Sequence, residues 1–202
     1  MSDYTSSDIK VMSDIDHIRL RYGMYIGEAD NPYQLLSEVI DNSIDEAVLN
    51  PKTEIKVFID NSKNLYRVED TGRGIPIGLK DIKGKKLETL EVICTIAHSG
   101  GKFDSKNYAT SSGLNGLGIT CTSALSNYFK ISTQRLGKKV TLETSKGIKC
   151  KDLVYEDVNK SYHGVTTEFI ADDTIFDNVE IPFSLIVRRC STIKAFGYNL
   201  KL

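Results

Sequence analysis

Between Glu38 and Ala47 the chain reads Glu-Val-Ile-Asp-Asn-Ser-Ile-Asp-Glu-Ala, inside a segment whose hydrophobic periodicity predicts a helix over residues 32–49. The Asn-Pro dipeptide at residues 31–32 supplies a capping residue and a proline for the first helical position. A second Asn-Pro dipeptide at residues 50–51 ends the helix. The predicted apolar face consists of Leu36, Ile40, Ser43, Ile44 and Ala47. We therefore expect one side of this helix to pack on a core.

The polar side of the same helix carries Glu38, Asn42 and Asp45 at positions i, i+4 and i+7, which share one face roughly opposite the apolar one. A solvated surface face is the simpler interpretation of such a triplet. A surface helix, however, favours Lys–Glu pairs, and no basic residue lies between Gln34 and Leu49. A carboxylate with a neighbouring amide offers hard oxygen ligands for Mg²⁺ and a proton acceptor for an attacking water.

A glycine-containing turn follows two predicted strands, residues 54–60 and 65–70. The turn reads Asp70-Thr-Gly-Arg-Gly-Ile-Pro76, and the sequence favours an irregular loop over residues 71–87. Asp and Gly are common in ordinary turns for backbone reasons. The functional alternative is that the carboxylate at the strand end accepts a hydrogen bond from an exocyclic amine, while the glycines let a flat ring approach the backbone.

A glycine- and serine-rich segment runs from Ser99 to Gly118, between a predicted helix at residues 87–98 and another at residues 119–127. A connection of that length inside a compact domain is usually a lid or a binding loop. Its last part, Ser-Gly-Leu-Asn-Gly-Leu-Gly at residues 112–118, leads directly into a helix, as expected of a backbone cradle for phosphate. No Gly-Lys-Ser/Thr follows, so it is not a Walker A motif, and a flexible turn is the plain alternative.

The remaining pattern indicates an α+β protein. Further strands are expected at residues 128–134, 138–145 and 164–170, then a helix at residues 182–196 and a last strand at residues 198–202. Helices bunched early and late around hairpin-like strands favour a two-layer sandwich, a mixed sheet with helices on one face, over a regular βαβ alternation. The polar residues 1–14 are expected to form a mobile arm.

Composition excludes several classes of protein. The 202 residues include 26 basic and 27 acidic side chains, and 40% of residues are apolar, the balance of an ordinary soluble protein. No apolar run is long enough for a membrane span, and the N-terminus has no signal-peptide core. The isolated cysteines exclude a zinc ribbon or a disulfide scaffold and favour buried, reduced thiols; they are Cys94, Cys121, Cys150 and Cys190.

The order of these motifs resembles that of the GHKL ATPases, specifically the ATPase domain of the B-type subunit of bacterial and phage type II topoisomerases. The matching stretches are Gly23-Met-Tyr-Ile-Gly27, Glu38 to Ala47, Asp70 to Pro76, Gly100-Gly-Lys-Phe103 and Gly113-Leu-Asn-Gly-Leu-Gly118. The first and fourth separate this branch from mismatch-repair, chaperone and histidine-kinase members. The resemblance implies the Bergerat fold for residues 15–202, a dimerisation arm at residues 1–14, and a cytoplasmic location in a bacterium or a phage-infected host.

The resemblance also implies roles for individual residues. Glu38 would be the general base that polarises water, Asn42 would bind Mg²⁺, and Asp45 would support that site indirectly. Asp70 would accept a hydrogen bond from the adenine amino group. The other nucleotide-binding residues that it implies are Tyr4, Gly74, Ile75, Lys102, Tyr108, Gly113, Leu114, Asn115, Gly116, Leu117, Gly118 and Thr167.

At the rim of the implied pocket, Glu46 and Arg73 would form an ion pair and Pro76, with Ile75, an apolar wall. Arg135 matches the family position that contacts aminocoumarin inhibitors. Tyr4 would reach into the pocket of a second copy of the chain. Two positions depart from the family: Asn115 stands where a His is usual, and Val165 where a Thr is usual, so that Thr167 on the same strand face would substitute.

The implied function is ATP binding and hydrolysis that drive dimerisation and DNA strand passage, with ATP, Mg²⁺, an A-type DNA-cleaving subunit and duplex DNA as partners. One alternative is a non-hydrolysing regulatory or decoy form of the same fold. Another is a repair- or chaperone-type GHKL protein. In the family a following domain supplies a lysine to the γ-phosphate, so we expect either a fragment or a short stand-alone protein, monomeric and with weak or no turnover by itself.

Overall fold

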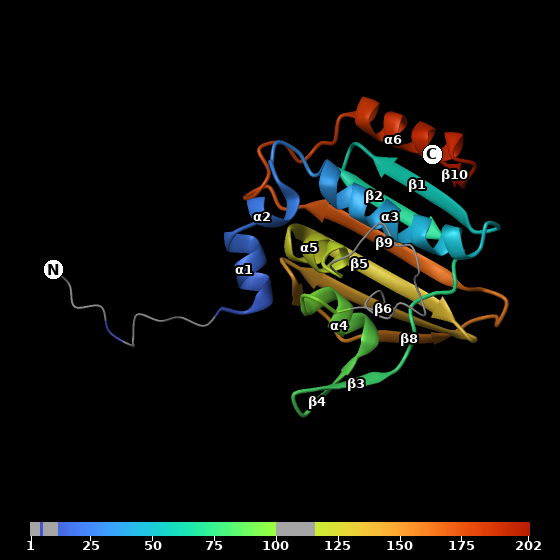
Figure 1. Cartoon of the computed structure of the whole chain (residues 1–202). Helices are drawn as coiled ribbons and strands as arrows, with labels where there is room; N and C mark the ends of the chain where they lie inside the picture. Colours follow the sequence, from blue (N-terminus) through green and yellow to red (C-terminus); the bar gives the residue numbers. More distant parts are fainter. Residues whose placement is uncertain (1–4, 6–11, 100–115) are drawn as a thin grey trace.

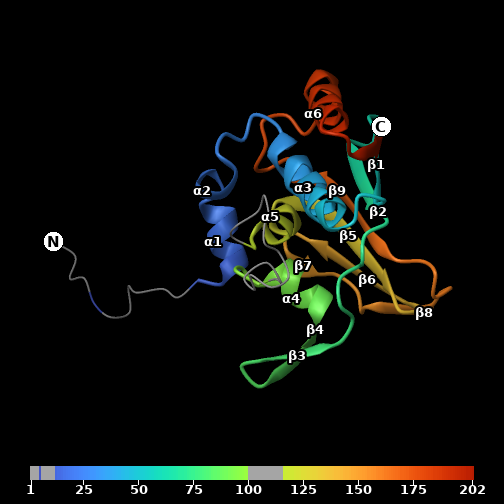
Figure 2. The ribbon, with the colours of Figure 1, turned by 45° about the vertical axis from the view of Figure 1, so that its right-hand side comes forward.

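One mixed β-sheet with helices over one of its faces forms the body of the molecule, as the computed structural model shows for residues 5, 12–99 and 116–202 (Figures 1 and 2). The helices are α1 (Asp14–Leu20), α2 (Gly23–Ile26), α3 (Tyr33–Leu49), α4 (Thr89–Thr95), α5 (Gly118–Ala124) and α6 (Phe183–Ala195). The strands are β1 (Glu54–Asp60), β2 (Leu65–Asp70), β3 (Leu79–Ile82), β4 (Lys85–Glu88), β5 (Ser126–Arg135), β6 (Lys138–Ser145), β7 (Ile148–Lys149), β8 (Val154–Asp157), β9 (Gly164–Ala171) and β10 (Asn199–Lys201). The predicted α+β sandwich is confirmed.

The sheet has the strand order β10-β1-β2-β9-β5-β6-β7, and β8 pairs with β6. Only the β1–β10 pair is parallel among the paired strands that the structure describes; the others are antiparallel. Helices α3, α4 and α5 pack on the same face of this sheet, while α6 lies along its β1–β10 edge (Figure 2). The arrangement brings the last residues of β2, and the first residues of β9 that pair with them, under α3.

The core lies between the sheet and these helices. Strand alternation turns Tyr66, Phe129 and Phe169 toward the helices, and each side chain is almost completely buried. The Tyr66 and Phe169 rings lie 5.5 Å apart between centroids. Removing one such side chain from water stabilises the fold by roughly 1.5–3 kcal/mol. The opposite face of the sheet is polar and partly exposed.

Helix α3 follows its prediction closely. It begins at Tyr33, one residue later than expected, and the Asn31 side-chain oxygen accepts a hydrogen bond from the Tyr33 N–H at 3.1 Å. It ends at Leu49, before Asn50. The predicted apolar face is buried except at Ile44, which is only partly buried.

The expected loop at residues 71–87 is wrong in its second half, because β3 and β4 form a hairpin that projects from the body (Figure 1). The turn is made by Lys83 and Gly84, whose φ angles are 52° and 82°. Consecutive left-handed residues match the twist of a two-residue hairpin, a signal that the surrounding lysines and glycines obscured. At the base of the hairpin, the Glu88 carboxylate accepts from the Gly78 N–H at 2.6 Å.

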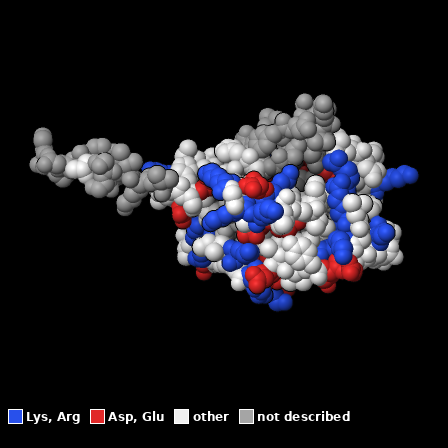
Figure 3. All heavy atoms as spheres, turned by 90° about the horizontal axis from the view of Figure 1, so that it is seen from below, with Lys and Arg blue, Asp and Glu red and all other residues white. Residues whose placement is uncertain are grey.

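The hairpin is basic without forming a one-sided patch. Its lysines are all exposed, and the register places Lys86 directly opposite Asp81 on one face, while Lys80 and Lys85 occupy the other. In the view from below, basic side chains outweigh acidic ones, and acidic side chains lie among them (Figure 3). Much of the charge on the neighbouring strand edge is paired, as in Lys138–Asp157 and Lys139–Glu156.

Two helices near the N-terminus have no counterpart in the sequence prediction. The Ser13 side chain caps α1 by accepting from the Asp16 N–H at 3.1 Å, so the last residues of the expected arm begin a helix. Helix α1 is fixed to the body by Arg19, which donates to the Asp172 carboxylate at 2.7 Å and to the Ala124 carbonyl at 2.6 Å. Sequence periodicity misses such short helices because seven residues make barely two turns.

Several other boundaries shift. Helices α4 and α5 are shorter than expected, and β5 begins at Ser126, where a helix was expected to continue. Strands β7 and β8 are additional. The expectation of buried thiols holds for Cys94, Cys121 and Cys190 but is wrong for Cys150, which is exposed. Within the described ranges, no helix has both the length and the apolar character that a membrane crossing requires.

Candidate functional site

A mostly buried carboxyl group lies where β2 ends beneath α3. Asp70 accepts hydrogen bonds from the Gly72 N–H at 2.8 Å and from the Ser43 hydroxyl at 3.1 Å. Burial raises the pKa of Asp70 to about 6, against the lowering effect of these two hydrogen bonds. At neutral pH the group is therefore an ionised acceptor in a place of low polarity, where a further donor would be bound strongly.

The strand register fixes the neighbours of this carboxyl group. Asp70 lies opposite Val165 on β9, and Val165 lies opposite Thr133 on β5. Thr167 shares the same sheet face but lies opposite Val68, one pleat farther along, and is 2% exposed. The predicted shared face is therefore correct, whereas the residue directly beside Asp70 is an apolar valine.

Both glycines of the turn after β2 are required by close contacts. A Cβ on Gly72 would lie 2.7 Å from the Glu46 Cβ and 2.8 Å from an Asp70 carboxylate oxygen. Gly74 has a φ of +74°, and a Cβ there would lie 2.4 Å from the Gln134 carbonyl oxygen. The turn thus passes flat against α3 on one side and β5 on the other, which only glycine allows.

The expected ion pair at the rim is present. Arg73 donates from Nε and Nη2 to the two Glu46 carboxylate oxygens at 3.0 and 2.9 Å, and its backbone N–H also donates to Glu46 at 3.0 Å. Arg135 donates to the Gly74 carbonyl at 3.0 Å. Ile75 packs against the core and Pro76 is exposed.

Sequence reasoning missed two hydroxyl groups in this region. The helical periodicity assigned Ser43 to an apolar face, yet its hydroxyl holds Asp70. Thr133 is 1% exposed and donates to the Ile75 carbonyl at 3.1 Å. A buried polar residue at an apolar position of a helix or strand was the available signal, because such a group needs a partner.

Glu38 lies one helical turn before Asn42 on the side of α3 that faces α5. Its carboxylate accepts from the Gln34 side chain at 2.9 Å, and its backbone carbonyl accepts from the Asn42 amide at 2.8 Å. A Cβ on Gly118 would lie 2.4 Å from a Glu38 carboxylate oxygen, so the start of α5 touches this group. The solvated-face interpretation is wrong here, and Asp45, on the same helix, is only 2% exposed.

Among the side chains that the structure describes, no group of three or more His, Cys, Asp or Glu residues could hold a metal ion. A cation at Glu38 and Asn42 would therefore need oxygen atoms from another source. The Asn42 amide nitrogen donates to the helix, so its oxygen lies on the other branch of the side chain and is a hard donor of the kind that Mg²⁺ accepts.

The expected residues fall into two groups that α3 joins. Around the end of β2 lie Asp70, Gly74, Ile75, Pro76, Glu46, Arg73, Arg135 and Thr167, and beside the start of α5 lie Glu38, Asn42, Gly116, Leu117 and Gly118. Asp45 is buried on α3 itself. Six further candidates lie outside the described residues, namely Tyr4, Lys102, Tyr108, Gly113, Leu114 and Asn115.

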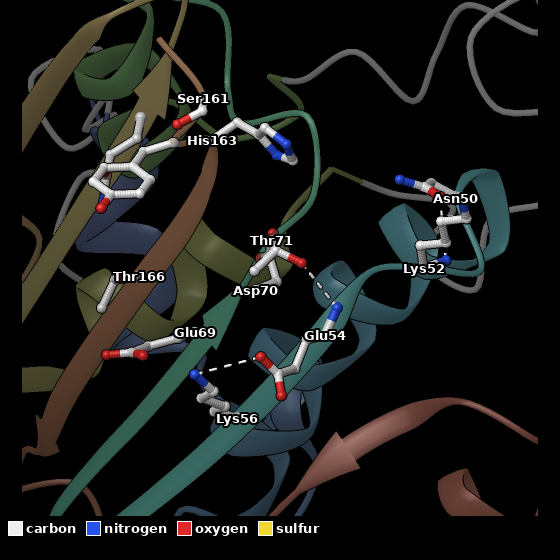
Figure 4. Close-up of a pocket in the computed structure, with 12 residues that line it drawn as sticks. Asn50, Lys52, Glu54, Lys56, Glu69, Asp70, Thr71, Ser161, His163 and Thr166 are labelled. Atoms are coloured by element: carbon white, nitrogen blue, oxygen red, sulfur yellow. Dashed lines mark hydrogen bonds and ion pairs between the residues drawn. The ribbon is translucent and has the colours of Figure 1, made fainter. Parts of the chain in front are cut away.

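A separate groove of about 720 Å³ lies on the opposite, polar face of the sheet (Figure 4). Lys56, Glu69 and Thr166 form its floor on three adjacent strands. Its upper border includes His163, whose ring approaches the turn after β2 from this side. Asp70 also lines this groove, while its carboxylate accepts from Ser43 of α3 and from Gly72.

Comparison with known proteins supports an ATPase. The profile of the histidine kinase-, DNA gyrase B- and HSP90-like ATPases matches residues 27–155. The B subunit of DNA topoisomerase 4 from Mycoplasma capricolum is 41% identical over 98% of this chain, and the B subunit of DNA gyrase from Spiroplasma citri is 37% identical over 99%. The chain spans only 31% of the length of each.

Solved structures give the same result. The 43K ATPase domain of Thermus thermophilus gyrase B in complex with an aminocoumarin superposes with a TM-score of 0.72 at 30% identity, covering 88% of this chain and 44% of that one. The topoisomerase IV ATP-binding domain of Francisella tularensis in complex with a small-molecule inhibitor has a TM-score of 0.72 at 28% identity, with 88% and 46% covered.

Proposed function

We propose, from the premise that the chain belongs to the family of histidine kinase-, DNA gyrase B- and HSP90-like ATPases, that residues 15–202 are the ATPase domain of a type II DNA topoisomerase. The buried Asp70 carboxylate between α3 and the strand ends carries this proposal. The similarity to the B-type subunits of topoisomerase 4 and gyrase supports the same class and does not favour the non-hydrolysing or repair- and chaperone-type alternatives.

The adenine end of the proposed site is built around Asp70. The carboxylate accepts a hydrogen bond from the exocyclic amino group of adenine. Thr167, two residues along β9 from Val165, contributes through a water molecule. Gly74 and Ile75 line the ring from the same turn, in which Gly72 lies against the Asp70 carboxylate. Guanine carries an oxygen where adenine carries the amino group, so the same carboxylate repels it. This arrangement selects adenine.

The triphosphate end is built around Glu38. Its carboxylate, oriented by Gln34, takes a proton from the water that attacks the γ-phosphate. Gly118 lies against this carboxylate, and the backbone of Gly116, Leu117 and Gly118 provides N–H donors for phosphate oxygens. Lys102, Tyr108, Gly113, Leu114 and Asn115 complete the nucleotide contacts.

We further propose Mg²⁺ as the cofactor, held by the Asn42 side-chain oxygen together with phosphate oxygens and supported indirectly by Asp45. When bound, the ion neutralises charge on the phosphates. The absence of a carboxylate cluster among the described residues agrees with a site in which the nucleotide supplies most ligands.

In the whole protein, ATP binding drives association with a second copy, whose arm, residues 1–14 with Tyr4, reaches across. The dimer admits duplex DNA that an A-type subunit cleaves, in the cytoplasm of a bacterial cell or infected host. The rim formed by Glu46, Arg73, Pro76 and Arg135 is a binding site for aminocoumarin-type inhibitors, as a structural relative was solved in complex with an aminocoumarin.

The experiment is a binding titration of Mg²⁺ and a non-hydrolysable ATP analogue against wild type, Asp70→Asn and the control Asp60→Asn. Asp60 lies on the turn at the far end of β1, where it accepts from Ser62. We expect wild type and Asp60→Asn to bind equally and Asp70→Asn to bind much more weakly. Equal binding by all three would overturn the assignment of the adenine site.

A further inference from the structure

The turn after β2 is held by hydrogen bonds at successive backbone groups. Asp70 accepts from the Gly72 N–H, and Glu46 accepts from the Arg73 N–H at 3.0 Å. The Arg73 N–H and the Gly72 carbonyl belong to the same peptide group, and the carbonyl accepts from the His163 Nδ1 at 2.6 Å. A carbonyl oxygen can only accept, so the proton lies on Nδ1. His163 and Glu46 thus hold the two ends of one peptide group from opposite faces of the sheet.

Without the His163 contact, this peptide group would be held at its N–H end alone, by Glu46. Gly72 has no side chain to restrict its backbone, and the contacts with Glu46 and Asp70 leave no room for one. The Gly72 N–H that donates to Asp70 belongs to the preceding peptide group, which is joined to this one at the Gly72 Cα, so a movement of that Cα would displace both hydrogen bonds. The direction of the Asp70 carboxylate therefore depends on a restraint that glycine itself cannot supply.

The position of His163 is fixed by the residue that follows it. Gly164 has a φ of +131°, and a Cβ there would lie 1.9 Å from the Asp70 carbonyl oxygen. The first residue of β9 therefore lies in close contact with the last residue of β2, its neighbour in the sheet. His163 directly precedes this contact, on the side of the groove, and its ring points toward the turn (Figure 4).

From these contacts we propose that His163 is a positioning residue for adenine selection. Its ring holds the Gly72 carbonyl, keeps the peptide between Gly72 and Arg73 in one orientation, and so aims the Asp70 carboxylate at the amino group of the base. This inference rests on the proposed nucleotide site and adds a residue on the opposite face of the sheet, which does not touch the nucleotide.

Loss of the His163 hydrogen bond affects recognition of the base and not of the triphosphate. Glu38 and the start of α5 lie at the other end of α3 from the turn, and no contact of His163 reaches them among the described side chains. Losing the restraint therefore weakens binding of an adenine nucleotide and leaves binding of a guanine nucleotide, which carries a carbonyl oxygen where adenine carries its amino group, nearly unchanged. One hydrogen bond of this kind corresponds to about fivefold in an equilibrium constant.

The test measures dissociation constants of the non-hydrolysable ATP and GTP analogues, with Mg²⁺, for wild type, His163→Phe and His163→Asn. Phe keeps a ring without a donor, whereas Asn carries an N–H donor on the same branch as Nδ1. We expect His163→Phe to lose about fivefold in the preference for the adenine analogue, and His163→Asn to recover most of it. Tyr162→Phe, at the neighbouring groove residue, is the matched control and keeps the wild-type preference.

Three outcomes overturn the inference. His163→Phe could retain the wild-type preference, or it could weaken both analogues equally with a lowered melting temperature, which would make the residue merely structural. Wild type could also bind neither analogue. That last outcome would refute the proposed function itself, so the two failures are distinguishable.

Discussion

At the scale of single residues, the account depends most on Asp70. A carboxylate with little exposure to water is costly to keep ionised, and two internal hydrogen bonds offset only part of that cost. Replacing it by Asn preserves its shape but puts a donor where the adenine amino group must donate. We predict that Asp70→Asn weakens binding of the ATP analogue by about 10- to 100-fold, the range of a charge-assisted hydrogen bond, in titration calorimetry.

The raised pKa of Asp70 leads to a second prediction, which concerns how the free energy of unfolding depends on pH. In the folded state this group keeps its proton up to a pH of about 6, whereas an unfolded Asp loses it near 3.8. Between these values the folded state binds more protons, so its stability falls as pH rises, and the loss is complete above about 6. Relative to Asp70→Asn, wild type should lose about 2 kcal/mol of unfolding free energy between pH 4.5 and pH 7.5.

Urea denaturation of both proteins at these two pH values measures this difference. Because all other groups titrate equally in the two proteins, the comparison isolates Asp70. A difference that stays constant, or one that grows in the opposite direction, would contradict a buried carboxyl group.

The proposed role of Glu38 as general base can be tested separately from nucleotide binding. Its neutral analogue Gln keeps the size of the side chain against Gly118 but cannot take a proton from water. In the full-length enzyme, Glu38→Gln should bind the ATP analogue like wild type and lose about 10²–10⁴-fold in turnover, as a phosphate-release assay would show. Turnover within a few fold of wild type would exclude Glu38 as the base.

At the scale of elements, α1 is joined to the body by a buried carboxylate. Asp172 follows β9, its side chain is completely buried, and it pairs with Arg19 of α1 and with Lys146 of the β6–β7 turn. Burial alone would raise the pKa of Asp172, but hydrogen bonds from Thr174, Arg19 and Lys146 outweigh it and lower the pKa to about 2. The contribution of this group to stability is therefore present above about pH 4 and is lost as pH falls toward 2.

We predict that Asp172→Asn destabilises the protein by about 2 kcal/mol at pH 7 in urea denaturation, and by less at pH 3. Asp173→Asn is the matched control, since that neighbour is exposed and accepts only from the Asn127 side chain among the contacts described. If both variants were equally stable, the link between α1 and the end of β9 would have no energetic role.

The elements differ in how far the sequence predicts them. Helix α3, β1 and β2 have strong periodicity and clear end signals, and their predicted bounds agree within one residue. The hairpin of β3 and β4 is missed because its strands are four residues long and mostly exposed. Helix α1 is missed because its position depends on Arg19 and Asp172, which are far apart in the sequence.

At the scale of the whole molecule, the sequence pattern predicts the two-layer fold, and the family resemblance implies the pairing of Glu46 with Arg73, which the structure contains. They do not predict Ser43, Thr133 or His163, because those contacts arise only when distant strands and loops meet. Val165 beside Asp70 is likewise a consequence of strand register. These contacts therefore depend on packing between residues that are far apart in the sequence.

The most direct test of the central claim is a calorimetric titration of this chain with a non-hydrolysable ATP analogue, with and without Mg²⁺. The account predicts one nucleotide bound per chain, more tightly when Mg²⁺ is present, because Asp70 holds the base while Asn42 and the phosphates hold the ion. The absence of binding at millimolar nucleotide would contradict it.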